Sequence, residues 1–201
     1  MNFQETETCT LLMRAYAGEC QSHVRYLLAS KAAAAQQLHV IRQVFEFTAK
    51  QELIHAQQFA EMLTKNGVSG IRIAAEYPLD APDDLMHALL SSAQFERNEA
   101  EGVYPAFAET AAREEQKEAA ALFRMIAEIE QMHANRFTLF GSLMEQDKLF
   151  REEHPTQWLC LNCGHIHEGT EPPQNCPVCG AVQGFAVRRN LAPFTPAGTM
   201  S

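Results

Sequence analysis

Apolar side chains recur at alternating intervals of three and four residues through most of the first 147 positions of the chain. This spacing places them on one face of a helix. Turn-forming residues divide the pattern, and it contains almost no β-branched runs. The sequence therefore predicts four helices, over 5–34, over 37–65, from near Pro82 onward and over 113–147. We expect Pro105 to kink or shorten the third helix.

Residues 66–81 interrupt the helical pattern with Gly67, Gly70 and Pro78. The stretch is too broken for a helix, yet it is long enough to join opposite ends of a helical bundle. Asp83 and Asp84 then follow Pro82, and acidic groups favour the first turn of a helix. The pattern predicts a mainly α fold, a four-helix bundle with one long crossover.

Each predicted buried face carries charged or imidazole side chains near the middle of its helix. On the second helix, the face that starts with Ile41 and Phe45 continues to Glu52 and His55. Burying one bare carboxylate has an idealised cost on the order of 20 kcal/mol. We therefore expect cations among the residues that share these faces, which are Glu19, Glu52, His55, Glu96, Glu99, Glu130 and His133.

One Glu from each of two helices and Glu-x-x-His from each of the other two is a ligand set typical of di-iron and di-manganese bundles. A single Glu-x-x-His arises often by chance, so the prediction depends on the combination. Glu19 to Glu52 spans 33 residues and Glu96 to Glu130 spans 34, which indicates an internal near-repeat. Glu99 is one carboxylate more than this set requires. A lone Tyr26 on the first face is more typical of packing.

Two C-x-x-C-G motifs, CLNCG at 160–164 and CPVCG at 176–180, lie near the C-terminus. They predict a tetrahedral four-thiolate site, and the spacing alone leaves zinc and iron open. A domain as short as this cysteine-bearing segment buries little apolar surface, so it needs a metal in order to fold. We expect the bundle to occupy 1–147, a linker 148–157, the small metal-knuckle domain 158–190 and a tail 191–201.

Composition narrows the partners. The chain has 25 acidic against 16 basic residues and a formal net charge of −9, which disfavours nucleic acid and anionic membranes. The first residues do not resemble a secretory signal, and no run is long enough to span a membrane. Because four of six cysteines form the C-x-x-C pairs, we expect a reducing compartment, the cytoplasm.

Taken in order, the motifs resemble the rubrerythrin family, in which a ferritin-like di-iron bundle precedes a rubredoxin-like domain. The similarity covers nearly the whole chain. It rests on AGECQSHVRY at 17–26, QELIH at 51–55, Glu96-x-x-Glu99 followed by VYPAF, EQMH at 130–133 and the paired knuckles. Gly102 and Val103 depart from the family pattern, as does Cys20 beside Glu19.

The resemblance implies two irons in the bundle and a role for each ligand. Glu52 and Glu130 would bridge the irons, and His55 and Glu99 would exchange as ligands when the redox state changes. One iron would be bound by Glu19 and Glu99, the other by Glu96 and His133. Tyr26 and Tyr104 match tyrosines near the peroxide-binding side of the site. A third iron would be bound by Cys160, Cys163, Cys176 and Cys179.

The resemblance also implies an activity, the reduction of hydrogen peroxide to water in protection against oxidative stress. The four-cysteine iron would pass electrons to the di-iron site, often across a homodimer interface. No G-x-G-x-x-G motif occurs, so the electron donor would be a separate flavin-dependent NAD(P)H reductase or a rubredoxin. The alternatives are a ferroxidase or iron-handling protein, an electron carrier with structural bundle metals, and zinc in the knuckles.

Overall fold

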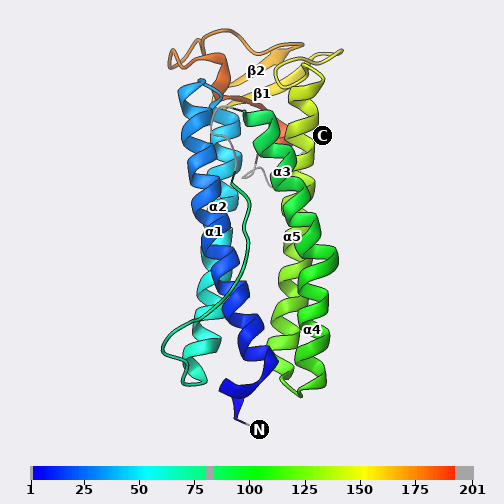
Figure 1. Ribbon diagram of the computed structural model, residues 1–201. Coiled ribbons are helices and arrows are strands. Elements are labelled where there is room, and N and C mark those ends of the chain that lie inside the picture. The colour runs from blue at the N-terminus through cyan, green and yellow to red at the C-terminus, as the bar shows by residue number, and fades with distance from the viewer. Residues whose placement is uncertain (1, 80–83, 193–201) are drawn as a thin grey trace.

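The computed structural model describes residues 2–79 and 84–192, and most of them are helical (Figure 1). Four long rods form a bundle, and one of them consists of two helices joined by a π-helical turn at Glu99–Val103. The predicted mainly α bundle with one long crossover is confirmed. The helices are α1 (Glu7–Ala35), α2 (His39–Lys65), α3 (Leu85–Asn98), α4 (Tyr104–Arg113) and α5 (Lys117–Glu145).

Side-chain caps set two helix starts that differ from the prediction. The Thr6 hydroxyl accepts a hydrogen bond from the Cys9 amide at 3.1 Å, so α1 begins at Glu7 rather than at residue 5. The Asp84 carboxylate accepts one from the His87 amide at 2.8 Å, so α3 begins after it. Pro82 and Asp83, where we predicted this start, lie outside the described residues.

The predicted start of the fourth helix at 113 is wrong. Arg113 is the last residue of α4, and α5 begins at Lys117 after a turn in which Glu115 has a φ of 59°. The Glu114 carboxylate turns away and accepts hydrogen bonds from the amides of Glu7 and Thr8, at 3.0 and 2.8 Å. This residue therefore caps α1 instead of continuing a helix.

Pro105 does not break the rod, because the helix changes to a wider π-helical turn just before it. The Tyr104 amide donates to the Glu99 carbonyl, which is the i to i−5 pattern of a π-helix. Pro105 then lies in the first turn of α4, where its missing N–H is not needed. The interruption that we predicted at Pro105 lies instead at Glu99–Val103 and includes a predicted metal ligand.

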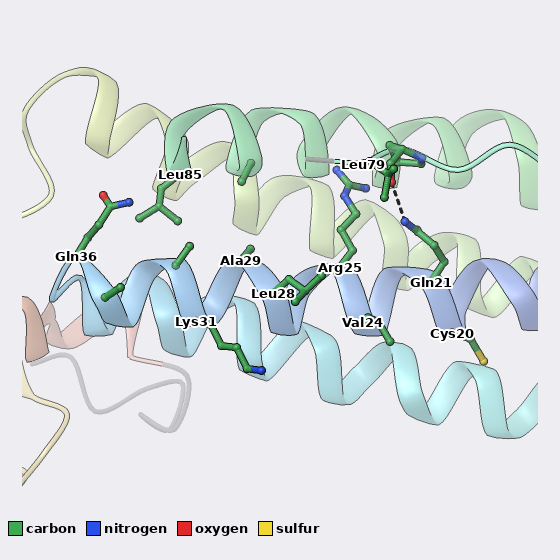
Figure 2. Close-up of a pocket in the computed structure, with 14 residues that line it drawn as sticks. Cys20, Gln21, Val24, Arg25, Leu28, Ala29, Lys31, Gln36, Leu79 and Leu85 are labelled. Carbon is green, nitrogen blue, oxygen red and sulfur yellow. Dashed lines mark hydrogen bonds between the residues drawn. The ribbon is translucent and has the colours of Figure 1, made fainter. Parts of the chain in front are cut away.

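The described part of the crossover, residues 66–79, contains no helix or strand and runs beside α1 along the bundle (Figure 1). The Gln21 side chain on α1 donates a hydrogen bond to the Pro78 carbonyl at 2.8 Å, next to Leu79 (Figure 2). The crossover is thereby attached to α1 before it reaches α3.

The apolar core of the bundle forms two clusters. Phe45 and Phe137 meet in the first, with ring centroids 5.2 Å apart, and Phe59 and Phe123 meet in the second at 5.6 Å. Along α2 and α5, the predicted ligands lie between these pairs of rings. The polar layer is therefore enclosed by aromatic side chains on both sides along the bundle axis.

The small C-terminal unit is a three-stranded antiparallel sheet in the order β2-β1-β3, formed by β1 (Thr156–Cys160), β2 (Ile166–Gly169) and β3 (Ala186–Arg188). Its buried Trp158 donates from the indole N–H to the Gly169 carbonyl at 2.9 Å. The strand β1 begins inside the predicted linker 148–157. In the predicted tail 191–201, Ala192 is buried, and residues 193–201 lie outside the described ranges.

This unit lies on the end of the bundle where α1 turns into α2 (Figure 1). The rings of His39 and Phe185 stack with centroids 3.8 Å apart. A Cβ on Gly184 would lie only 1.7 Å from the Gln37 carbonyl oxygen. Val187 belongs to the first apolar cluster of the bundle, so the two units share a core. Within the described ranges, no helix has the length and apolar character needed to cross a bilayer.

Candidate metal centre

Among the described residues, the carboxylates and imidazoles of the bundle form two overlapping sets. In each set, one ligand atom from every residue lies within 4.8 Å of the others. Glu52 and Glu130 belong to both sets, so they stand between two positions. The first set is Glu19, Glu52, His55 and Glu130, and the second is Glu52, Glu96, Glu130 and His133.

Each set has an imidazole Nδ1 atom that faces three carboxylates. His55 Nδ1 lies 3.0 Å from Glu130 Oε1 and 3.3 Å from Glu52 Oε2, with Glu19 Oε2 at 3.6 Å. His133 Nδ1 lies 2.6 Å from Glu130 Oε2, 2.8 Å from Glu52 Oε1 and 3.7 Å from Glu96 Oε2. The two rings are stacked with centroids 5.7 Å apart. The arrangement repeats around the shared pair of carboxylates.

The same atoms fit metal ions better than they fit one another. Both Nδ1 atoms and both oxygens of Glu130 are buried and have no hydrogen-bond partner among the described residues. Oxygens of Glu19, Glu52 and Glu96 share this condition. Buried polar atoms are normally paired, and lone pairs that converge on one point are a coordination geometry. The donor chemistry of oxygens with a few imidazoles suits two divalent cations.

The electrostatics of the site indicate the same need. Burial, reinforced by neighbouring carboxylates, raises the pKa of Glu19, Glu96 and Glu99 well above the usual range. Burial acts to lower the pKa of His133, but Glu52 and the other facing carboxylates outweigh it and raise that pKa. Five carboxylates against two imidazoles leave an excess of negative charge that bound cations would neutralise.

Glu99 is the one predicted bundle ligand that the structure places in neither set. It lies in the π-helical turn, its residue is 8% exposed, and it lines a cavity that opens on the bundle surface. Glu96, three residues earlier, is fully buried. His55 therefore occupies a place in the ligand cluster that Glu99 does not, and the role of Glu99 stays a prediction.

The two predicted tyrosines each bind a carboxylate of the cluster. The Tyr26 hydroxyl donates a hydrogen bond to Glu96, and the Tyr104 hydroxyl donates one to Glu19. Both side chains are buried, Tyr26 within the first apolar cluster and Tyr104 within the second. Each ring thus belongs to an apolar cluster while its hydroxyl orients one ligand.

Sequence reasoning missed a supporting group behind His133. The Nε2 atom of His133 lies 3.1 Å from Gln51 Oε1, and Arg136 donates to the same oxygen at 3.0 Å and to the Thr48 hydroxyl at 2.9 Å. Because the amide oxygen accepts, Nε2 is the donor, and a neutral His133 would present the lone pair of Nδ1 to a metal. Gln51 directly precedes Glu52, but its position beside the buried face gave no periodic signal.

The four knuckle cysteines come together as predicted. The Sγ atoms of Cys160 and Cys179 are 3.8 Å apart, and those of Cys163 and Cys176 are 3.7 Å apart. Metal–sulfur bonds of about 2.3 Å give a tetrahedron with edges of about 3.8 Å. Gly164 adopts a φ of 79° in the first knuckle, and its amide donates to the Cys160 carbonyl at 2.8 Å.

Hydrogen bonds to sulfur favour the thiolate form of one knuckle cysteine, Cys179. The Asn162 side chain donates to Cys179 Sγ at 3.4 Å, and this bond, with one from the Ala181 backbone, lowers the pKa of Cys179 to about 6. Cys160 and Cys176 are buried, whereas Cys163 and Cys179 are exposed. One side of the site thus faces the protein and the other faces solvent.

Comparison with known proteins agrees with both sites. Residues 10–140 match the family described as "Rubrerythrin", and residues 158–185 match "Rubrerythrin, rubredoxin-like domain". The chain belongs to the rubrerythrin family. A rubrerythrin of Clostridium perfringens is 39% identical over 90% of this chain and 93% of its own. A rubrerythrin of Nitratidesulfovibrio vulgaris is 34% identical over 84% of this chain and 86% of its own.

Solved structures support the fold of this rubrerythrin-family chain. Nigerythrin in a mixed-valence state aligns over 94% of this chain and 93% of its own, with a TM-score of 0.62 and 26% identity. A bacterioferritin of Desulfovibrio desulfuricans aligns over 71% of this chain and 82% of its own, with a TM-score of 0.65 and 21% identity. The ferritin-like bundle is confirmed. The carboxylates and imidazoles of the bundle are the ligands of a di-iron centre, and the four knuckle cysteines are those of a rubredoxin-type iron site.

Proposed function

We propose that the protein is a peroxidase that reduces one hydrogen peroxide to two water molecules, consuming two electrons and two protons. The observation that carries the proposal is that two units with a shared core contain a buried ligand set for two cations and a four-cysteine site. When bound, two irons would supply one electron each and the positive charge that stabilises the separating oxygens. The proposal is supported by the family to which the chain belongs, because rubrerythrins are oxidoreductases.

The chain itself would hold the metal ligands in one arrangement, between the two apolar clusters. Glu52 and Glu130 would bridge the two irons, since each belongs to both ligand sets. We propose that either His55 or Glu99 would complete the ligands of one iron, because His55 faces the cluster while Glu99 lies beside it. The aromatic side chains of the two apolar clusters shield the ligands from water along the bundle axis.

The two tyrosines hold protons at defined atoms. Burial, followed by the charge of Glu96, raises the pKa of Tyr26 well above its usual range, and burial with Glu19 does the same for Tyr104. Both hydroxyls therefore stay protonated at neutral pH and remain donors to the ligand carboxylates. We propose that they keep these carboxylates oriented while the redox state of the site changes.

Electrons would enter through the small unit. Cys163 and Cys179 are exposed, where a flavin-dependent NAD(P)H reductase or a rubredoxin could dock, whereas Cys160 is buried. Leu161, next to Cys160, packs against the first apolar cluster of the bundle. The knuckle thus connects solvent with the bundle core, which supports a relay rather than a purely structural metal.

The decisive test separates electron supply from peroxide chemistry. In Cys160→Ser, steady-state peroxide reduction driven by a reductase should fall to background. The chemically reduced protein should still react once with peroxide, because the bundle ligands are intact. Absorbance stopped-flow and metal analysis measure both, and Ile166→Thr, an exposed change in β2, serves as control. Full steady-state activity in Cys160→Ser would exclude the relay.

We also propose that the protein forms a homodimer. A groove of about 980 Å³ runs along α1, where Val24 and Leu28 are 54% and 56% exposed and Leu79 lies opposite (Figure 2). Apolar patches of this kind mark interaction sites, and a second copy would cover this one.

Charge placed in that groove should separate the two copies. Leu28→Glu should shift the molar mass measured by light scattering toward that of one chain. Met125→Glu, an equally exposed apolar position on α5, should leave the molar mass unchanged. A monomeric wild-type protein would exclude the proposed dimer.

A further inference from the structure

A cavity of about 250 Å³ opens on the bundle surface beside the ligand cluster. Its walls come from three segments that are distant in sequence. Arg14 and Gly18 lie on α1, Tyr77 lies on the crossover, and Glu99 and Tyr104 lie at and after the π-helical turn. Glu99 is the one predicted metal ligand among the lining residues, and Tyr104 is hydrogen-bonded to Glu19. The cavity therefore leads from solvent to Glu99 and Tyr104, at the edge of the ligand cluster.

The Tyr77 ring and the Glu99 carboxylate both border the space beside Gly18 in this cavity. A Cβ atom placed on Gly18 would lie 3.8 Å from Tyr77 Cε1 and 3.8 Å from Glu99 Oε1, which is ordinary contact on both sides. The gap beside Gly18 is thus bordered by both side chains, and a methyl group placed there would contact each of them. An oxygen atom of hydrogen peroxide is no larger than a methyl group, whereas a branched alkyl or aryl substituent is much larger.

Hydrogen bonds fix Tyr77 at this position although the crossover has no regular structure there. Its hydroxyl donates to the Arg14 carbonyl at 3.4 Å. The next residue, Pro78, accepts from the Gln21 side chain at 2.8 Å (Figure 2). Arg14 is itself positioned over the Phe107 ring, 5.5 Å from its centroid. Tyr77 is therefore attached to α1 in two ways, through its own hydroxyl and through the carbonyl of the next residue.

We propose that this cavity is the route by which peroxide reaches the bundle site, and that Tyr77 determines specificity by excluding bulky organic hydroperoxides. The inference rests on the proposed peroxidase function and adds an access route and a residue that determines specificity. Gly18 also keeps this route open, because any side chain at that position would fill the gap. Tyr77 acts by steric exclusion and touches none of the reacting atoms.

Two substitutions change the gap in opposite directions. Tyr77→Ala opens it, so the second-order rate constant of the reduced holoprotein with cumene hydroperoxide should rise by about tenfold or more relative to that with hydrogen peroxide. Tyr77→Phe keeps the ring, and the Gln21 bond to Pro78 still holds the backbone, so this variant should retain the wild-type preference. Arg72→Ala, an exposed change on the same crossover, controls for altered chain flexibility. Rapid-mixing absorbance measures each rate constant.

Gly18→Ala closes the gap without strain, since the added methyl makes only ordinary contacts and alanine favours a helix. The rate constant with hydrogen peroxide should fall by about tenfold while iron content stays unchanged. Azide binding to the oxidised holoprotein gives a readout that is independent of activity. Its association rate should also fall in Gly18→Ala and remain near wild type in Arg72→Ala.

The outcomes separate this inference from the proposed function. If the wild-type protein does not react with hydrogen peroxide, the peroxidase proposal fails, and the azide association rates still test the access route. An unchanged substrate preference in Tyr77→Ala would overturn the role of the ring. An unchanged azide association rate in Gly18→Ala would show that small molecules enter elsewhere.

Discussion

The bundle site and the knuckle site solve the same problem, the burial of metal-binding groups, in opposite ways. The bundle gathers its ligands from four rods over residues 19–133, and apolar clusters enclose them. The knuckle takes four cysteines from residues 160–179 of the small unit, whose largest buried side chain is Trp158. One site is held by a large core, whereas the other must help to hold its own small core.

This difference shows which of the two sites needs its metal in order to fold. Tyr26, Tyr104 and Gln51 orient ligands of the bundle through hydrogen bonds that do not require a metal. The knuckle has Gly164 and Gly180 turns around its sulfurs but little apolar surface. Metal binding should therefore be coupled to folding in the small unit and to local order alone in the bundle.

Removing one knuckle thiolate should have the largest effect. Structural tetrahedral sites contribute about 10 kcal/mol to folding, so Cys176→Ser should unfold the small unit and leave the bundle helical. Trp158 is the single tryptophan of the chain, so its fluorescence reports on this unit alone. We expect a red-shifted emission with unchanged far-ultraviolet dichroism. Cys20→Ser, outside the knuckles, should keep the native emission, and a native spectrum in Cys176→Ser would contradict the comparison.

Changing the support of one bundle ligand should have a moderate effect. Gln51→Leu removes the acceptor for His133 Nε2 and a partner of Arg136. Loss of such a supporting group lowers metal affinity by about 10- to 100-fold, which chelator competition measures. Gln51→Glu keeps an acceptor oxygen and should retain most of the affinity. Equal iron retention in the leucine variant and the wild type would show that the bundle core alone orients His133.

A single cap should have the smallest effect, because the bundle distributes its stability. Glu114→Ala removes the acceptor of the Glu7 and Thr8 amides and should cost about 1 kcal/mol. For a chain of this size that corresponds to about 2–4 °C in Tm. Glu109→Ala, exposed on α4, should change Tm less. Equal melting temperatures in the two variants would show that this cap contributes nothing.

The same cap should respond to acid. Hydrogen bonds from Thr8, first its hydroxyl and then its amide, lower the pKa of Glu114 in the folded protein. The stabilisation is therefore present above the unfolded-state pKa and is lost as pH falls through the lower folded-state pKa. The Tm difference between wild type and Glu114→Ala should shrink in acid, and a difference that grows would contradict this assignment.

The sequence was sufficient for the features that repeat. Glu52 and His55 could be placed on a buried face because the apolar spacing around them is regular, and the cysteines because their spacing is short. The start of α5 could not be predicted, since Glu114 leaves the helical path to cap residues more than a hundred positions away. Tyr77 was missed for the same reason, because its place beside Glu99 depends on how the crossover lies on α1.

Gly184 illustrates how one absent side chain can govern the behaviour of a redox protein. Any Cβ there would collide with the backbone oxygen of Gln37, so the small unit approaches the bundle as closely as two backbones allow. Electron tunnelling slows exponentially as the gap between donor and acceptor widens. If the proposed relay runs within one chain, a glycine at this junction keeps the two units as close as possible, and a larger residue would slow the relay without touching either metal site.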